Sequence, residues 1–212
     1  NMPTGAAASE ELYARLVDFG RRHGILICND NPYSFILNDR PISILAQPGA
    51  KDCCLELNSL SKAHNMAGWR IGMVAADSEV IAQILKVKSQ MDSGMFKPLQ
   101  LAAVQALAQG GEWFSQLNDE YRRRRVLAGD IFDLLGVKYD VDSTGMFLWG
   151  KVPSDMQGAQ LSDRILYEAG VFITPGFIFG KNGEDYIRIS LCAKPETLRE
   201  AAERIRQAGI NR

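Results

Sequence analysis

One lysine lies in a segment whose neighbouring side chains can bind an anion. Ser59 and Ser61 precede Lys62, and Arg70 follows it eight positions later between two glycines. Hydroxyls and a guanidinium hold a dianion through charge-assisted hydrogen bonds, and the planar guanidinium does so with a rigid fork. A lysine amine can condense with an aldehyde. The segment therefore predicts a site for a phosphorylated aldehyde, with Lys62 as the reacting amine. The alternative is a surface loop that carries an ordinary lysine.

Three further polar residues lie next to or within apolar runs that are predicted to be strands. Asp30 and Tyr33 follow the apolar run 25–28, at the carboxyl end of the strand, where ligands of open α/β sheets gather. Arg188 lies inside the apolar run 186–191, and a buried guanidinium needs a partner because burying it unpaired is costly. Ordinary turn chemistry is the alternative for Asp30, and a salt bridge between strands or domains is the alternative for Arg188.

Hydrophobic periodicity and capping signals predict the elements that position these residues. The expected strands are residues 25–28, 53–57, 71–76, 137–141, 146–149, 171–174 and 186–191. The expected helices are residues 10–23, 78–87, 98–109, 112–135, 159–168 and 195–207. Strands and helices alternate in the first half, which indicates parallel βαβ units. The sequence therefore predicts an α/β fold, with a long helix that connects it to a smaller α+β domain.

Charge and hydropathy argue against two classes of partner. Acidic and basic residues nearly cancel, leaving a net charge of -1, so neither a nucleic-acid footprint nor a polybasic membrane surface is expected. No apolar run approaches the length needed to span a bilayer, and the first residues lack the features of a signal peptide. The basic run 122–125 spreads around the whole circumference of a helix, which favours a solvated or salt-bridged helix over a nucleic-acid contact.

Cysteine and histidine spacing gives no support for a metal site. Cys53 and Cys54 are adjacent and lack the spacing of zinc ligands, and His23 and His64 are far apart in the sequence. The four cysteines are interpreted as reduced thiols of a cytoplasmic protein.

The segment 59–72 resembles the lysine signature of the class I/II aminotransferases, which are pyridoxal-phosphate enzymes of fold type I. That signature reads approximately Ser-x-Ser-Lys, a short spacer, then Gly-x-Arg-x-Gly, and it matches here with Lys62 and Arg70. The family's Asp-x-x-Tyr pair matches Asp30 and Tyr33, and its strand arginine matches Arg188. The resemblance covers nearly all of this chain, but only the later part of the family.

The resemblance implies a role for each matched residue. Lys62 would bind pyridoxal 5'-phosphate and move the substrate's proton, and Arg188 would bind the substrate's α-carboxylate. Asp30 would face the pyridine nitrogen and Tyr33 the ring oxygen. A carboxylate beside the ring nitrogen keeps it protonated, which makes the ring a better electron sink. The remaining cofactor-binding residues would be Ser59, Ser61 and Arg70.

The first residues resemble the family's Asn-Pro-Thr-Gly turn but depart from it. Met2 stands directly before Pro3, and the asparagine is one position earlier, at Asn1. The resemblance makes Asn1 the cofactor-binding candidate of this turn, since the methionine sulfur at the matching position cannot donate the family's hydrogen bond to the ring oxygen. The family's preceding glycine-rich loop and stacking aromatic have no counterpart here. We expect these 212 residues to be a fragment that by itself binds the cofactor weakly or not at all.

The resemblance implies a domain assignment and an activity. Residues 1–115 would form the C-terminal part of a mostly parallel-sheet large PLP-binding domain, and residues 116–212 the connector helix and small C-terminal domain. The expected activity is transfer of an amino group between an α-amino acid and a 2-oxo acid, in a homodimer. Two alternatives stay open: a pyridoxal-phosphate-dependent carbon–sulfur β-lyase on the same scaffold, and a non-catalytic aminotransferase-like domain.

Overall fold

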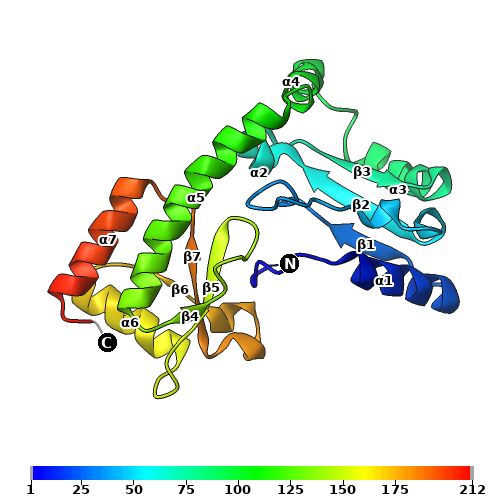
Figure 1. The fold of residues 1–212 in the computed structure, drawn as a ribbon. Helices are drawn as coiled ribbons and strands as arrows, with labels where there is room; N and C mark the ends of the chain where they lie inside the picture. Colours follow the sequence, from blue (N-terminus) through cyan, green and yellow to red (C-terminus); the bar gives the residue numbers. More distant parts are fainter. Residues whose placement is uncertain (1, 211–212) are drawn as a thin grey trace. The chain divides into compact units, whose positions relative to one another are not determined.

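The computed structural model describes residues 2–210, which form an α/β fold of two compact units (Figure 1). The N-terminal unit comprises Ala8–Ser115. The C-terminal unit comprises the described residues from Gln116 onward together with those that precede Ala8. Each unit has its own sheet.

The N-terminal unit is built on a three-stranded mixed sheet in the order β1-β2-β3. Its strands are β1 (Ile27–Asp30), β2 (Cys54–Ser59) and β3 (Gly72–Ala76). Its helices are α1 (Glu10–His23), α2 (Leu60–Ala63), α3 (Ser78–Met91), α4 (Lys97–Leu107) and the start of α5 (Gly111–Leu134), with 3-10 turns η1 (Ile44–Ala46), η2 (Ala50–Asp52) and η3 (Ala67–Trp69). The predicted alternation of helix and strand is therefore confirmed in this unit.

Capping chemistry fixes both ends of α1. The Ser9 side chain accepts a hydrogen bond from the Leu12 amide, and Gly24 ends the helix in the left-handed conformation with φ 63°. The amide of Ile25 still donates to the carbonyl of Gly20 (2.9 Å). Because Ile25 completes the helix cap, β1 begins at Ile27, two residues later than the apolar run predicts.

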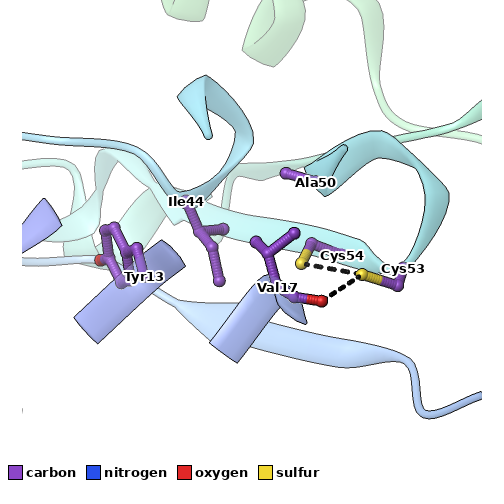
Figure 2. Close-up of a cluster of buried hydrophobic side chains, with 6 residues drawn as sticks. All are labelled: Tyr13, Val17, Ile44, Ala50, Cys53 and Cys54. Carbon is purple, nitrogen blue, oxygen red and sulfur yellow. Dashed lines mark hydrogen bonds between the residues drawn. The ribbon is translucent and has the colours of Figure 1, made fainter. Parts of the chain in front are cut away.

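A cluster of buried side chains joins α1 to β2 (Figure 2). It contains Tyr13 and Val17 of α1, Ile44 and Ala50 of the two 3-10 turns, and Cys53 and Cys54. The Cys53 thiol donates to the Val17 carbonyl (3.6 Å), and its sulfur lies 3.8 Å from that of Cys54. Removing this apolar surface from water stabilises the packing of α1 against the turns that precede β2.

The pairing of β3 corrects one expectation from the sequence. β1 and β2 are parallel, but β3 runs antiparallel to β2, with Ser59 opposite Gly72. A parallel connection needs a crossover of a dozen or more residues, usually including a helix that covers the sheet. Here residues 60–71 fold into the short helix α2 and the turn η3, so the chain turns back on itself. The prediction of a parallel βαβ unit at this point is wrong.

The C-terminal unit has a four-stranded sheet in the order β4-β5-β7-β6. Its strands are β4 (Lys138–Tyr139), β5 (Phe147–Lys151), β6 (Thr174–Pro175) and β7 (Tyr186–Ser190), and all described pairings are antiparallel. Its helices are the rest of α5, α6 (Gly158–Ala169) and α7 (Pro195–Gln207), with turns η4 (Gly176–Phe179) and η5 (Lys181–Gly183). Fully buried side chains include Phe132, Leu148, Ile165, Ile187 and Ile205.

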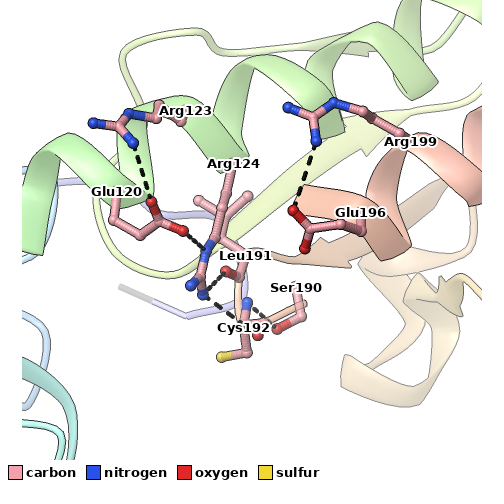
Figure 3. A network of polar contacts seen from close by, with 8 residues as sticks. All are labelled: Glu120, Arg123, Arg124, Ser190, Leu191, Cys192, Glu196 and Arg199. Carbon is pink, nitrogen blue, oxygen red and sulfur yellow. Dashed lines mark hydrogen bonds and ion pairs between the residues drawn. The ribbon is translucent and has the colours of Figure 1, made fainter. Parts of the chain in front are cut away.

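The arginine run of α5 makes contacts within this unit (Figure 3). Arg124 pairs with Glu120 (2.9 Å) and donates to the carbonyls of Leu191 (3.2 Å) and Cys192 (3.4 Å), which follow β7. Arg122 and Arg123 pair with acidic residues one turn earlier on the helix. The interpretation of this run as a salt-bridged helix is confirmed.

Residues 2–210 contain neither a helix suited to cross a membrane nor a cluster of side chains suited to hold a metal ion. Among these residues no helix combines the length and apolar character needed to cross a bilayer. In the same range, no three His, Cys, Asp or Glu side chains are grouped so that they could hold a metal ion.

Candidate active site

The hairpin that connects β2 to β3 presents Lys62. Ser59 pairs with Gly72, and the Leu60 amide donates to the carbonyl of Ile71 (3.2 Å), so the two ends of the connection are held together. A side-chain carbon at Gly72 would lie 2.6 Å from the carbonyl oxygen of Asn58, so this close approach requires glycine. The twelve-residue connection, residues 60–71, is therefore a closed loop that carries both Lys62 and Arg70.

The parallel pairing of β1 with β2 brings Asp30 and Tyr33 to the same end of the sheet as Lys62. Asp30, the last residue of β1, lies opposite Leu57, and the Asn31 amide donates to the Leu57 carbonyl (2.9 Å). Two residues later β2 ends at Ser59, and α2 begins directly after it at Leu60 (Figure 1). The Lys62 Nζ lies 5.8 Å from the centroid of the half-buried Tyr33 ring. An amine, a phenol and a carboxylate thus come from one edge of the sheet.

Ser59 and Arg70 have defined local roles in the loop. The Ser59 hydroxyl caps α2 by accepting a hydrogen bond from the Ser61 amide (3.1 Å). Arg70 adopts the left-handed conformation (φ 53°, ψ 49°), which is uncommon for a residue with a side chain. Its Nη1 donates to the carbonyl of Ala67 (2.9 Å), and the residue is exposed. The guanidinium therefore lies on the same loop as the amine and is accessible to an anion.

Residues at the start of α5 support the lysine helix. The Trp113 indole donates to the carbonyl of Ala63 (2.8 Å), the residue after Lys62. The Phe114 ring makes an edge contact with His64, with the centroids 5.6 Å apart. Burial lowers the pKa of His64, because the charged imidazolium loses its hydration there. The far end of α2 is therefore held by the aromatic side chains of Trp113 and Phe114.

Arg188 belongs to the C-terminal unit and contacts two aromatic rings. Its guanidinium carbon lies 4.1 Å from the centroid of Phe147 and 4.2 Å from that of Phe179. Phe147 is on β5, and Phe179 ends the turn η4. Trp149, which pairs with Arg188 across the strands, stacks on Tyr186 with the centroids 5.0 Å apart. Cation–π contacts of this kind orient a guanidinium plane.

A cavity of about 520 Å³ lies beside the same strand. Arg188, Ile189 and Ser190 contribute to its wall, and the rest comes from residues 170–174, Ala193, α7 and α5. Two of the charged residues that line it, Glu200 and Arg204, pair with each other. The cavity is lined mainly by apolar atoms.

The structure thus groups the sequence-predicted residues by unit. Five of them come from one edge of the N-terminal sheet and the loop that follows it, together with the lysine: Asp30, Tyr33, Ser59, Ser61 and Arg70. Arg188 lies in the C-terminal unit, and its role remains a prediction. Asn1 lies outside the described residues, so its predicted contact is not placed.

Sequence reasoning missed residues that support the site. Glu56 stands between Leu55 and Leu57 in an apolar strand, and this lone carboxylate was the available signal. Trp113 carries no comparable signal, because its partner Ala63 lies 50 positions away, and Phe179 carries none, because its contact with Arg188 depends on how the turn η4 folds against β7.

Comparisons with known proteins identify close relatives. A family model described as aminotransferase class I and II matches residues 1–205. The LL-diaminopimelate aminotransferase of Aquifex aeolicus (strain VF5) is 41% identical over 208 residues, which are 97% of this chain and 54% of that protein. Apo-BacF from Bacillus subtilis superposes with a TM-score of 0.91 at 34% identity, and the match covers 100% of this chain and 54% of BacF. A probable N-succinyldiaminopimelate aminotransferase from Thermus thermophilus gives a TM-score of 0.88 at 33% identity, over 98% of this chain and 56% of that one. The chain spans about half the length of the curated relatives it matches.

Proposed function

The chain belongs to the aminotransferase class I and II family, and from this premise we propose that its protein transfers an amino group between an α-amino acid and a 2-oxo acid. The observation that carries the proposal is the position of the Lys62 amine, 5.8 Å from the Tyr33 ring centroid, at the sheet edge where β1 ends at Asp30. An amine, a phenol and a carboxylate at one edge are the groups that a pyridoxal cofactor requires.

The residues of the N-terminal unit fit pyridoxal 5'-phosphate. When bound, this cofactor supplies an aldehyde that condenses with amines and a ring that withdraws electrons. The Asp30 carboxylate would hold a proton at the pyridine nitrogen, and the Tyr33 hydroxyl would bind the ring oxygen. The exposed guanidinium of Arg70 and the hydroxyls of Ser59 and Ser61 would bind the phosphate. Lys62 Nζ would accept the proton from the substrate's Cα and hold it for the transfer that follows.

Arg188 is proposed to bind the α-carboxylate of the amino acid. The centroids of Phe147 and Phe179 lie 4.1 Å and 4.2 Å from its guanidinium carbon, and these two contacts help to fix the orientation of the guanidinium. Two parallel N–H donors of a guanidinium match the two oxygens of a carboxylate. This arrangement supports recognition of an acid group in one plane.

We propose LL-diaminopimelate as the first amino donor to test. Relatives that carry the name LL-diaminopimelate aminotransferase are 41% and 38% identical to this chain over 208 residues. A panel of other α-amino acids is assayed together with LL-diaminopimelate, so that the preferred donor is found by comparison.

The dependence on an acceptor separates this function from its closest competitor. A carbon–sulfur β-lyase would use the same lysine, aspartate and arginines, but it needs no 2-oxo acid acceptor. The test follows 2-oxo acid release from each amino acid by the protein as its gene encodes it, with and without an added acceptor. Turnover beyond one equivalent of the enzyme only with the acceptor is expected. Continued release without acceptor would overturn the aminotransferase assignment.

A Lys62→Ala variant tests the third possibility, a domain that does not turn over. We expect this variant to lose transfer, whereas Lys97→Ala, which changes a residue at the start of α4, should keep it. Equal activity in Lys62→Ala and the unaltered protein would contradict the role of Lys62.

The remaining assignments extend the same proposal. Residues 1–115 are proposed as part of the large cofactor-binding domain, and residues 116–212 as the connector helix and small domain. We also propose a cytoplasmic homodimer. The exposed apolar side chains of β3, α3 and α4 support self-association, because an apolar surface of this kind is usually covered by a partner. They include Met73, Val74, Leu85, Val87, Met91, Leu101 and Val104. Sedimentation of the gene-encoded protein would check this, and a monomer would contradict it.

A further inference from the structure

A buried carboxylate outside the proposed set of cofactor contacts lies in the middle of β2. Glu56 is 8% exposed, and its neighbours along the strand, Leu55 and Leu57, are apolar. Burying a carboxylate is costly unless hydrogen bonds replace its hydration. The burial of the Glu56 carboxylate therefore needs hydrogen-bond donors around it.

Three donors converge on a single oxygen of this carboxylate. Glu56 Oε2 accepts hydrogen bonds from Asn29 Nδ2 (3.0 Å), the Ser43 hydroxyl (2.8 Å) and the Ile44 amide (3.2 Å). Asn29 Nδ2 also donates to the Tyr13 hydroxyl (3.2 Å). Hydrogen bonds to an ionised acceptor are stronger than neutral ones, so the three contacts together can offset the cost of burial.

The donors stand at the two ends of one loop. Asn29 directly precedes Asp30, and Ser43 is the N-cap of η1, so residues 30–42 lie between them. This loop carries Asp30 and Tyr33, the two residues assigned to the cofactor ring. Glu56 therefore joins the start of the loop to its end through one atom.

Inside the loop, other contacts build on this closure. Ile36 is fully buried, and its amide donates to the Tyr33 carbonyl (3.0 Å). The Asn38 side chain donates to the Ser34 carbonyl (3.0 Å). These local bonds shape the loop, but they do not attach it to the sheet. The loop is attached to the sheet by the Asn31 amide at one end and by the Glu56 contacts at both ends, and Phe35 also stacks on Phe114 of α5 with the centroids 4.9 Å apart.

We propose that Glu56 is a positioning residue, whose carboxylate closes the loop 30–42 and so sets where Asp30 and Tyr33 stand relative to the Lys62 amine. The role of that loop in cofactor binding rests on the proposed function. The closure of the loop by Glu56 does not, because it is present in the protein without cofactor. Glu56 does not touch the Lys62 amine in this arrangement; it acts through Asn29, Ser43 and Ile44.

Three variants separate closure from general stability. Glu56→Ala removes the acceptor. Glu56→Gln keeps one carbonyl oxygen that can accept the same bonds without charge, so it should give an intermediate effect. Cys54→Ala is the matched control, because Cys54 is 1% exposed, lies two residues earlier on β2 and takes no part in these hydrogen bonds.

Two measurements on the gene-encoded protein without cofactor test the closure. Hydrogen exchange of peptides that cover residues 30–42 should be about ten-fold faster or more in Glu56→Ala, and less accelerated in Glu56→Gln. Acetylation of Lys62, measured by mass spectrometry relative to Lys97, should also rise in Glu56→Ala as the Tyr33 ring leaves the amine. Cys54→Ala should change neither the exchange rate of residues 30–42 relative to that of α3 nor the acetylation of Lys62 relative to Lys97.

Loop exchange and Lys62 acetylation that are the same in Glu56→Ala as in Cys54→Ala would overturn the proposal. If Glu56→Ala does not fold, Asn29→Ala provides the same comparison with the carboxylate in place. A titration with pyridoxal 5'-phosphate then examines the proposed function separately. Failure of the unaltered protein to bind would count against the cofactor assignment, while exchange and acetylation would still decide the role of Glu56. Binding equally tight in Glu56→Ala and the unaltered protein would contradict the positioning of Asp30 and Tyr33.

Discussion

The two phenyl rings around Arg188 give a prediction for substrate binding. The guanidinium carbon lies 4.1 Å from the Phe147 centroid and 4.2 Å from that of Phe179, and Arg188 is half-buried. A cation–π contact contributes between about 0.5 and 2 kcal/mol, depending on how far the pair is desolvated. For one of two rings at a half-buried site we take about 1 kcal/mol, which is about five-fold in a binding constant.

The perturbation is Phe179→Leu, and Phe177→Leu is its control. Both residues lie in η4 and both are partly exposed, at 39% and 50%, so the two substitutions remove similar surface from the same turn. We expect Phe179→Leu to raise KM for the amino donor by about five-fold. We expect kcat to change less, because the carboxylate is bound in both the ground state and the transition state. Steady-state kinetics with the gene-encoded protein measure both constants.

The comparison between the two variants tests whether the contact of Phe179 with Arg188 contributes to substrate binding. Equal KM values for Phe179→Leu and Phe177→Leu would refute the reasoning, because the distance of Phe179 from Arg188 would then have no consequence. A fall in kcat at constant KM would also refute it. Arg188→Lys should raise KM more than either phenylalanine substitution does, since an ammonium lacks the planar pair of donors that a guanidinium offers to a carboxylate.

Two further predictions concern the support of the lysine loop. Because burial lowers the pKa of His64, the unfolded protein binds a proton more readily, and stability should fall as the pH is lowered from about 7.5 through the ordinary histidine value of about 6.5. Thermal unfolding of His64→Gln should show a smaller loss over this range, and an unchanged loss would contradict the assignment. Trp113→Phe removes the donor to the Ala63 carbonyl and should cost about 1 kcal/mol, or about 2–4 °C in the unfolding temperature. A stability equal to that of the unaltered protein would show that this hydrogen bond contributes nothing.

Local chemistry made much of the fold predictable. Ser9 and Gly24 mark the ends of α1 because capping depends on a side chain and a backbone conformation at single positions. The long helix expected at residues 112–135 occurs as Gly111–Leu134, since its apolar periodicity extends over many turns. The helix expected at residues 195–207 has these bounds in the structure.

Features that depend on distant partners were not predictable in the same way. The apolar run at 25–28 gave no sign that the Ile25 amide completes the cap of α1 and delays the strand. The direction of β3 depends on how residues 60–71 fold, and a strand pattern is the same in parallel and antiparallel sheets. The expected strand at 171–174 pairs only at Thr174 and Pro175, because pairing requires alignment with β7.

The site residues that lie within one segment could be predicted from their spacing. The contacts between distant segments could not be predicted. The hydroxyls, Lys62 and Arg70 lie within a dozen positions, so a single closed loop holds them. Asp30 joins them because parallel strands end at the same edge of a sheet. The Glu56 contacts link residues 12 to 27 positions apart, and no sequence pattern specifies such a convergence.

The most direct test of this account locates the cofactor on the chain. The gene-encoded protein is mixed with pyridoxal 5'-phosphate, reduced with borohydride to make the linkage permanent, digested and analysed by mass spectrometry. We expect a phosphopyridoxyl group on the peptide that contains Lys62, in excess over every other lysine. Labelling spread over exposed lysines, or concentrated at a residue other than Lys62, would contradict it.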